Sequence, residues 1–233
     1  MSIYVTGDIH GYPIRFDQAQ LESMGLNLTE NDKVIICGDF GLPWYGDKEE
    51  GCCLDWLEAK PFAILFVDGN HENFDLLNVL PVEEKYGGKV QKLRNNIFHL
   101  MRGEVYEIEG KTFFAFGGAT SVDKHMREEH IDWWKEEVFS EAEKLNAIWN
   151  LEQIGNKVDC VITHTLPRSL LADLPVHLQG ADTCPVSEFL DELSYKIKYK
   201  KWYFGHFHTD AKINEMFTCM YENIEEIELV CFE

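Results

Sequence analysis

Five short runs of β-branched and aromatic residues recur along the chain, and each one ends at a polar residue capable of chemistry. The runs cover residues 3–5, 34–37, 63–67, 158–162 and 202–204. Nearly continuous apolar runs of this kind are typical of strands that are buried on both faces. Helical patterns fit between them at residues 14–24, 47–59, 140–149 and 186–195. The alternation of strands and helices predicts an α/β sheet.

A second group of strand-like segments is expected to form a separate, antiparallel partner sheet. These segments cover residues 97–100, 104–108, 112–116, 211–221 with a turn at Asn214, and 227–231. A chain of 233 residues can bury a sizeable core, and no repeat, linker or low-complexity tract marks an internal boundary. We therefore expect a single domain over residues 1–233.

The polar residues at the ends of the five runs form the most informative pattern. They read Thr6-Gly7-Asp8, Gly38-Asp39, Asp68-Gly69-Asn70-His71, Thr163-His164 and Gly205-His206-Phe207-His208. One Gly-Asp pair after a strand is usually only a turn. In open α/β sheets, however, loops from separate strands converge at the carboxyl ends, so five coincident stops predict one shared site.

The side chains at this predicted site are suited to binding metal ions. Imidazole nitrogen mixed with carboxylate and amide oxygen favours Mn, Fe, Zn or Ni over Mg or Ca. A pair of ions needs one shared ligand, and Asp39 is the natural bridging carboxylate. The four histidines outside the stops are expected to have ordinary structural or surface roles, namely His99, His125, His130 and His177.

The ordered motifs resemble those of the calcineurin-like metallophosphoesterases. They are Gly7-Asp8-Ile9-His10-Gly11, Gly38-Asp39, Gly69-Asn70-His71-Glu72, Thr163-His164 and Gly205-His206-Phe207-His208, and they extend from residue 7 to residue 208. The resemblance implies a four-layer αββα sandwich of two mixed sheets flanked by helices. It also implies a metal-dependent phosphoric ester hydrolase, either a phosphatase or a phosphodiesterase.

The resemblance further implies a division of roles among the site residues. Asp8, His10 and His208 would bind one ion, Asn70, His164 and His206 the other, and Asp39 would bridge the two. Two divalent ions, with manganese the first choice, would lower the pKa of bound water so that hydroxide attacks the phosphorus at neutral pH. His71 would serve as the catalytic residue that donates a proton to the leaving group or stabilises its charge.

One departure from the family pattern leaves two questions open. In the serine/threonine phosphatase branch, the second motif continues with an Asp that orients the catalytic histidine and an Arg that grips phosphate. Here Asp39 is followed by residues 40–44, Phe-Gly-Leu-Pro-Trp, so both are absent. Asp68 is one candidate for orienting His71. Arg127 or Lys124 could contact phosphate, with a surface salt bridge as the alternative.

Composition narrows the class of partner and the compartment. The balance of 41 Asp and Glu against 21 Lys and Arg gives a formal charge of -20, which argues against long nucleic acid and favours a small phosphorylated compound. Acidic pairs at 49–50, 128–129 and 136–137 are expected on solvated surfaces. Seven cysteines without metal-finger spacing indicate reduced thiols, with Cys37 and Cys160 acting as small hydrophobes. No apolar run is long enough for a membrane span, so we expect a cytoplasmic protein.

Three other classes of protein compete with a dinuclear phosphoesterase as an interpretation of the sequence. The segment 205–210 partly mimics the metallo-lactamase motif, but residue 211 is Ala where that motif has His, and the segment comes late in the chain. HD-domain phosphohydrolases need a His-Asp dipeptide, which the sequence lacks. A non-catalytic scaffold of the same fold for protein partners stays open. The oligomeric state, the native metal and the choice between monoester and diester also stay open.

Overall fold

The computed structural model describes residues 1–175, 178 and 184–228. Within these residues the first sheet has seven strands in the order β13-β1-β2-β3-β6-β5-β4. Its strands are β1 (Ile3–Thr6), β2 (Lys33–Ile36), β3 (Ala63–Phe66), β4 (Val82–Lys85), β5 (Gly88–Lys92), β6 (Ile97–Leu100) and β13 (Glu225–Glu226). The strands β1, β2, β3 and β6 are parallel, while β13, β5 and β4 pair antiparallel at the two edges.

The second sheet has six strands in the described part of the chain, in the order β11-β12-β10-β9-β8-β7. They are β7 (Val105–Ile108), β8 (Lys111–Phe116), β9 (Cys160–Thr163), β10 (Lys201–Phe204), β11 (Ala211–Lys212) and β12 (Phe217–Cys219). The central strands β8, β9, β10 and β12 are parallel, and β7 and β11 pair antiparallel at the edges. Both sheets are therefore mixed.

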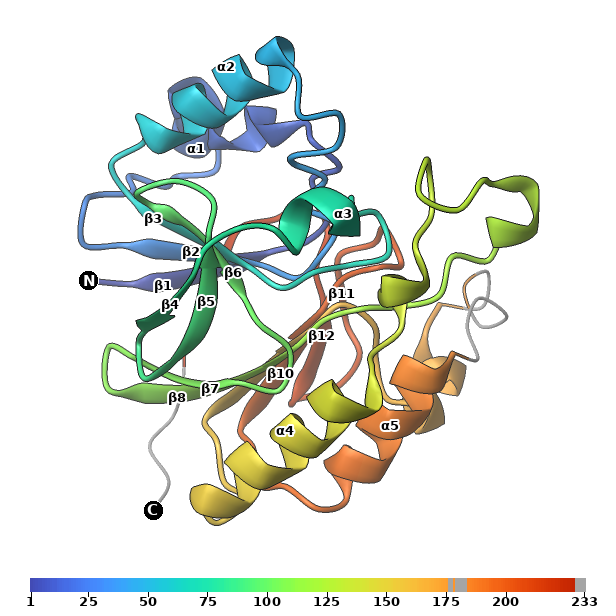
Figure 1. Cartoon of the computed structure of the whole chain (residues 1–233). Helices are drawn as coiled ribbons and strands as arrows, with labels where there is room; N and C mark the ends of the chain where they lie inside the picture. The colour runs from blue at the N-terminus through green and yellow to red at the C-terminus, as the bar shows by residue number, and fades with distance from the viewer. Residues whose placement is uncertain (176–177, 179–183, 229–233) are drawn as a thin grey trace.

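Helices cover the outer face of each sheet (Figure 1). Among the described residues the α-helices are α1 (Gln18–Ser23), α2 (Lys48–Glu58), α3 (Phe74–Leu77), α4 (Glu141–Gln153) and α5 (Pro185–Ser194). The 3₁₀ turns include η1 (Pro13–Phe16), η2 (Lys124–Met126), η3 (Lys135–Glu137) and η4 (Arg168–Asp173). Polar side chains start the longer helices: Asp47 caps α2, and Ser140 caps α4 in a reciprocal capping box with Glu143.

Three apolar clusters hold the layers together, and their composition gives the architecture. One cluster lies between the two sheets and joins residues such as Val5 and Leu65 of the first sheet to Phe113 and Ile162 of the second. The other two lie between each sheet and its own helices, α1 to α3 on one side and α4 and α5 on the other. The predicted αββα sandwich is confirmed. Cys37 and Cys160, which were predicted to act as small hydrophobes, are both free cysteines buried in the inter-sheet cluster.

The prediction of which strands form which sheet was wrong in part. The five apolar runs of the first predicted group do not make one sheet, because two of them, β9 and β10, belong to the second sheet beside β8. Conversely, β6 was assigned to the antiparallel group but pairs in parallel with β3. The central strands of both sheets are parallel and buried on both faces, so they show the same kind of apolar run, which does not tell the two sheets apart. The expected strand at 227–231 lies largely outside the described residues.

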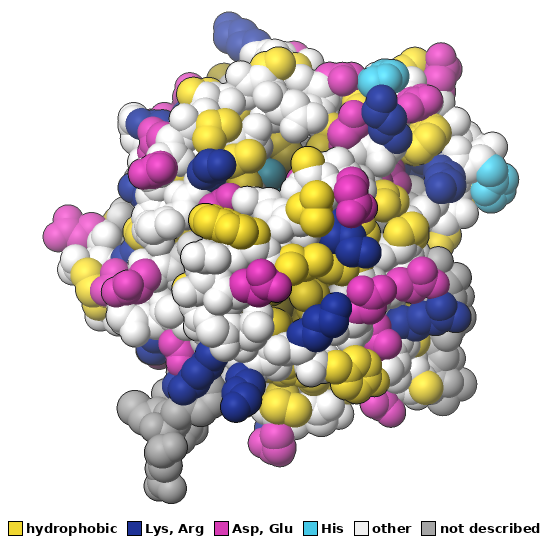
Figure 2. Space-filling model, turned by 60° about the horizontal axis from the view of Figure 1, so that its bottom comes forward, with side chains coloured by type: hydrophobic (Ala, Val, Ile, Leu, Met, Phe, Trp, Pro, Cys, Tyr) yellow, Lys and Arg dark blue, Asp and Glu magenta, His cyan; other side chains and the backbone are white. Residues whose placement is uncertain are grey.

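Charged side chains of both signs are spread over the face that Figure 2 shows. Acidic and basic side chains are interspersed with apolar ones over this face, and no stripe of one sign crosses it. Among the residues that the structure describes, no helix is both long and apolar enough to traverse a bilayer.

Candidate metal centre

The seven predicted ligands come together at the carboxyl ends of five parallel strands. Asp8, Asp39 and Asn70 follow β1, β2 and β3 of the first sheet, and His164, His206 and His208 follow β9 and β10 of the second. His10 lies in the loop after Asp8. Because the two sheets pack face to face through the inter-sheet cluster, the loops of both sheets meet at one edge of the sandwich.

Four of these side chains form a compact group of donor atoms. One ligand atom from each of Asp8, His10, Asp39 and His208 lies within 4.8 Å of all the others. The Nε2 atoms of His10 and His208 are 2.9 Å apart, and the Nε2 of His208 is 3.2 Å from Oδ2 of Asp8. Two imidazole nitrogens and two carboxylates that converge in this way can surround one divalent cation.

The other three predicted ligands form a second group, which meets Asp39 at Oδ1, whereas His10 faces Oδ2. The Nε2 of His164 is 3.3 Å from Oδ1 of Asp39 and 3.1 Å from Oδ1 of Asn70, and its ring centre is 5.0 Å from that of His206. The Nδ1–H of His164 donates to the carbonyl of Cys37 at 2.8 Å, and so its Nε2 lone pair is directed at the site. Asp39 thus has donor groups on both sides, as a bridging carboxylate needs.

The backbone is strained at four of the seven predicted ligands. His10, Asp39, His206 and His208 have φ values of 45°, 50°, 68° and 47°, in the left-handed region that side chains with a Cβ rarely adopt. Strain of this kind costs on the order of 1–3 kcal/mol per residue and persists where the surrounding structure enforces it. Its concentration on predicted ligands indicates that the loops are held in a functional conformation.

Two motif glycines allow the loops to approach each other closely. A Cβ on Gly69 would lie 2.0 Å from Oδ1 of Asp39, and a Cβ on Gly205 would lie 2.2 Å from Oδ1 of Asp8. The space is taken by the carboxylates, and nearby backbone amides donate to them: the N–H of His71, two residues after Gly69, to Asp39 at 2.7 Å, and the N–H of His206, directly after Gly205, to Asp8 at 3.1 Å. Glycine is therefore needed at both positions to leave room for the ligands.

The electrostatic environment keeps the ligand atoms available. Burial would raise the pKa of Asp39, but the neighbouring histidines His164, His71 and His10 lower it to about 2. Burial, reinforced by His164, lowers the pKa of His206 to about 3. Asp39 is consequently anionic and His206 neutral at neutral pH, which are the forms that bind a cation.

A chain of hydrogen bonds orients Asn70. Its Nδ2 donates to Oγ of Ser121 at 3.1 Å, and this hydroxyl donates in turn to Oε1 of Glu137 at 2.9 Å. The backbone N–H of Ser121 donates to the other carboxylate oxygen of Glu137 at 2.9 Å. With its amide nitrogen fixed in this way, Asn70 turns its carbonyl oxygen toward the site. Glu137 was predicted on a solvated surface, and that prediction was wrong because the residue is 2% exposed.

Two further residues to which the sequence pattern assigned no role support the predicted ligand loops. Arg15 donates to the carbonyls of Gly7, Asp8 and Tyr221, and so it ties the first loop to the C-terminal part of the chain. Glu72 accepts from the backbone N–H groups of Phe40 and Gly41 at 2.8 and 3.0 Å, directly after Asp39. Neither residue could be assigned from spacing, because each acts on backbone atoms of distant segments.

The structure answers the question of what lies beside His71. Asp68 does not orient it, because the Asp68 carboxylate pairs with the buried Arg102 and with Nε2 of His99 at 3.0 Å. Instead, Nη1 of Arg127 lies 3.5 Å from Nδ1 of His71. Lys124 lies over the ring of Trp133. Of the two predicted phosphate contacts, Arg127 is therefore the one beside His71.

The remaining histidines mostly have the structural and surface roles that were expected. His99 is buried between Gln91 and Asp68, His130 pairs with Asp75 on the surface, and His125 is exposed. His177 lies outside the described residues. The ring of His71 is 5.1 Å from that of His10, so His71 borders the metal ligands and can approach a group bound to them.

Comparison with known proteins gives a family match over most of the chain. A family model for calcineurin-like phosphoesterases matches residues 1–210. A candidate 5′-nucleotidase from Staphylococcus aureus, solved in complex with alpha-ketoglutarate, is similar with a TM-score of 0.46 and 15% identity. That similarity covers 94% of this chain and 48% of the other, so the chain spans about half of its length. No curated protein matches.

Proposed function

The chain belongs to the calcineurin-like phosphoesterase family, and we propose that it is a metal-dependent phosphoric ester hydrolase that works with two divalent ions. In this proposal Asp8, His10 and His208 hold one ion, Asn70, His164 and His206 hold the other, and Asp39 bridges them. The single observation that supports it most directly is the group of converging donor atoms of Asp8, His10, Asp39 and His208, all within 4.8 Å of one another.

The donor set fits divalent ions, and the residues beside it fit hydrolysis. Bound divalent ions supply Lewis acidity, which neutralises the phosphoryl oxygens and makes water nucleophilic near neutral pH. His71 borders the ligands and would donate a proton to the departing oxygen. Arg127, whose Nη1 lies 3.5 Å from Nδ1 of His71, would attract phosphate to this place by its charge.

The mixed imidazole and oxygen donors favour manganese as the native metal, with iron, zinc or nickel as alternatives. The net charge of -20 favours a small phosphorylated substrate over a long nucleic acid. We propose a cytoplasmic location for the enzyme, as expected for the reduced cysteines.

A combined metal and activity assay separates this enzyme from a non-catalytic scaffold of the same fold. The purified protein is loaded with Mn²⁺, its metal content is determined, and hydrolysis of p-nitrophenyl phosphate and bis(p-nitrophenyl) phosphate is followed. We expect about two ions per chain and turnover of at least one of these esters. A protein that binds no metal and cleaves neither ester would support the scaffold instead.

Replacing His71 by alanine should remove turnover while leaving the metal in place. His71 donates no ligand in the proposed arrangement, and a general acid typically contributes roughly 10²–10⁴-fold. We expect kcat to fall by that factor, with metal content unchanged by elemental analysis.

His125→Ala provides the matched control, because His125 is an exposed histidine outside the cluster. It should retain both turnover and metal. Wild-type turnover in a metal-replete His71→Ala protein would show that His71 is not the acid.

Replacing Ser121 by alanine should weaken binding of one metal ion. The variant loses the hydroxyl that holds Asn70 Nδ2 and leaves Glu137 with one partner fewer. Loss of a group that orients a ligand typically costs about 10–100-fold in metal affinity. Titration with Mn²⁺ should reveal one weakened site and one unaffected site, since Ser121 bonds to Asn70 and not to the ligands Asp8, His10 and His208 of the other ion. Two unchanged affinities would mean that Asn70 needs no support from Ser121.

A further inference from the structure

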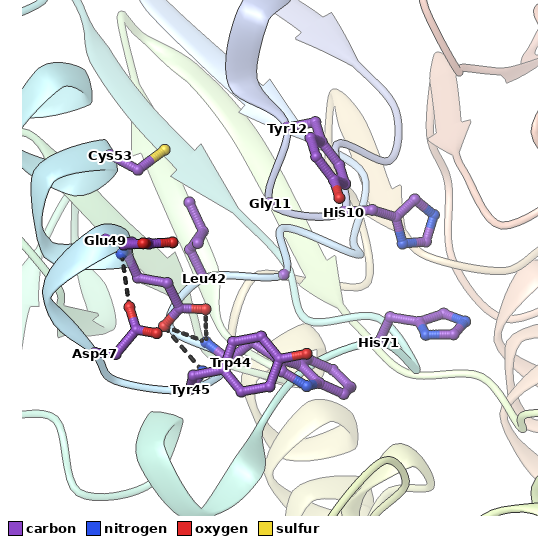
Figure 3. A pocket seen from close by; sticks show the side chains of 12 residues that line it. His10, Gly11, Tyr12, Leu42, Trp44, Tyr45, Asp47, Glu49, Cys53 and His71 are labelled. Carbon is purple, nitrogen blue, oxygen red and sulfur yellow. Dashed lines mark hydrogen bonds between the residues drawn. The ribbon is translucent and has the colours of Figure 1, made fainter.

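A cavity of about 520 Å³ opens directly from the candidate metal centre. His10 and His71 lie at one end of it, and Asp47, Glu49 and Cys53 lie at the other (Figure 3). Its volume lies in the range of small-molecule sites, about 300–1,000 Å³. A phosphoryl group held at the metal ligands would therefore extend its alcohol portion into this cavity.

Aromatic side chains form two opposite walls of the cavity. Tyr12 lies on one side, and Trp44 and Tyr45 lie on the other (Figure 3). Tyr12 and Tyr45 are 79% and 78% exposed, so neither ring is used for packing within the described part of the chain. Rings in such positions offer flat faces on which a planar group can stack.

The wall that carries Trp44 and Tyr45 is built to stay in place. The Glu50 carboxylate accepts the backbone N–H groups of Trp44, Tyr45 and Gly46 at 2.7 to 3.0 Å. The carbonyl of Trp44 accepts from Asn73 at 2.7 Å, and the ring of Trp44 packs edge-on against the buried Trp134 at 5.3 Å. The aromatic wall is therefore preorganised, which reduces the entropy lost on binding.

The far end of the cavity is acidic and has one uncommitted carboxylate. Glu50 is occupied by the backbone amides, and Asp47 accepts the N–H of Glu50 at 3.0 Å as the cap of α2. Glu49 makes no hydrogen bond or ion pair with any residue that the structure describes. A group at this end would meet a hydrogen-bond acceptor and negative charge, so amino groups are favoured there and anions are disfavoured.

We propose that this cavity selects the substrate: a phosphate monoester whose alcohol carries a planar ring with amino groups and no second anionic group. A nucleoside monophosphate with an exocyclic amino group has this chemistry. The ring stacks between Tyr12 and Tyr45, and its amino group donates to Glu49. This inference rests on the proposed function, because the phosphoryl group must be held at the candidate metal centre.

Four substrates that differ by one feature test the proposal on the Mn²⁺-loaded enzyme. Cytidine 5′-monophosphate has the planar ring and the amino group, and uridine 5′-monophosphate has a carbonyl in place of that amino group. Orotidine 5′-monophosphate is the uridine ester with an added ring carboxylate. Ribose 5-phosphate has no planar ring. We expect kcat/KM to be highest for the cytidine ester. It should exceed that of the uridine ester by about tenfold, as for a hydrogen bond to a charged group. The uridine ester should exceed ribose 5-phosphate by about tenfold, as for stacking of one base. The cytidine ester should therefore exceed ribose 5-phosphate by about a hundredfold. The orotidine ester should be cleaved more slowly than the uridine ester.

Variants of the cavity connect these preferences to named side chains. Glu49→Gln should abolish the preference for cytidine over uridine, because an amide both donates and accepts. The double variant Tyr12→Ala/Tyr45→Ala should lower kcat/KM for the cytidine ester toward that of ribose 5-phosphate, which should itself be unchanged. Tyr195→Ala and Glu152→Gln are matched controls, because both residues are exposed and lie beside the second sheet, Tyr195 directly after α5 and Glu152 in α4. Both should behave as wild type.

The possible failures can be told apart. Equal kcat/KM for ribose 5-phosphate and the cytidine ester, or ratios that the cavity variants leave unchanged, would overturn the inference. Turnover of bis(p-nitrophenyl) phosphate with none of the monoesters would also overturn it, while the proposed phosphoesterase activity would stand. If the Mn²⁺-loaded protein cleaves no ester at all, the proposed function fails and the inference fails with it.

Discussion

Replacing Asp39 by alanine is expected to lower kcat/KM by about a thousandfold or more and to release metal. Asp39 is buried and lies between both groups of donor atoms, 3.7 Å from Nε2 of His10 and 3.3 Å from Nε2 of His164. In the proposed dinuclear site it is therefore the side chain whose loss would affect both ions. Charge stabilisation by metals contributes several kcal/mol to such reactions, and each ~1.4 kcal/mol corresponds to a factor of ten.

The measurement combines kinetics with metal analysis, because the two together separate loss of the site from loss of the fold. Circular dichroism should show an intact fold in the variant. Asp55→Ala is a suitable control, since Asp55 is an exposed carboxylate of α2 that pairs with Arg94 on the surface. It should keep its metal. An Asp39→Ala enzyme that retains both ions would contradict the bridging role.

Replacing Arg102 by leucine is expected to destabilise the protein by about 3–5 kcal/mol. Arg102 donates two hydrogen bonds to the Asp68 carboxylate, and the two side chains are 3% and 1% exposed. Without the guanidinium, Asp68 becomes a buried charge with only His99 beside it, which is costly in a medium that solvates ions poorly. Urea unfolding followed by fluorescence measures the change in free energy of unfolding.

A double-variant cycle identifies the pair as the cause. Asp68→Asn/Arg102→Leu removes both charges and should be less destabilised than the sum of the two single changes. Burial favours the neutral form of Asp68, but Arg102 and His99 outweigh this and hold its pKa well below the usual value. The stability that Asp68 contributes is thus present above its unfolded pKa of about 3.9 and is lost as the pH falls below it. Additive effects of the two single variants would contradict the coupling.

Much of the fold was visible in the sequence, because its strands are nearly continuous apolar runs. Burial on both faces requires such runs, and helices and glycine-rich turns separate them. The short charged hairpin of β4 and β5 was not predicted, since segments such as Val82–Lys85 are exposed and lack the apolar signal. The division of strands between the sheets was also not predictable in full, because β3, β6, β9 and β10 are all short, mostly buried strands whichever sheet they join.

The candidate ligands were also visible in the sequence, because each one follows a strand that the pattern identifies. Their neighbours were not. Asp68 was a candidate to orient His71, yet the Asp68 carboxylate accepts hydrogen bonds from Arg102, 34 residues further along the chain. Glu137 was predicted on the surface, yet it is buried beside the site and accepts a hydrogen bond from Ser121. A carboxylate next to a strand end has the same appearance in the sequence whether it faces a metal, a cation or water.

By itself the sequence determined the chemical types of the donor atoms, their order along the chain and their position at strand ends, since covalent connectivity and the strand pattern are local properties. Only the tertiary structure decided which donors converge, which groups orient them and what encloses the substrate. Asp8 and His208 are 200 residues apart in the chain, and their atoms lie 3.2 Å apart because two sheets pack face to face. Likewise, Tyr12 and Tyr45 form opposite walls of one cavity only because the loops after β1 and β2 lie side by side. Contacts of this kind depend on packing across the whole molecule, which no local pattern encodes.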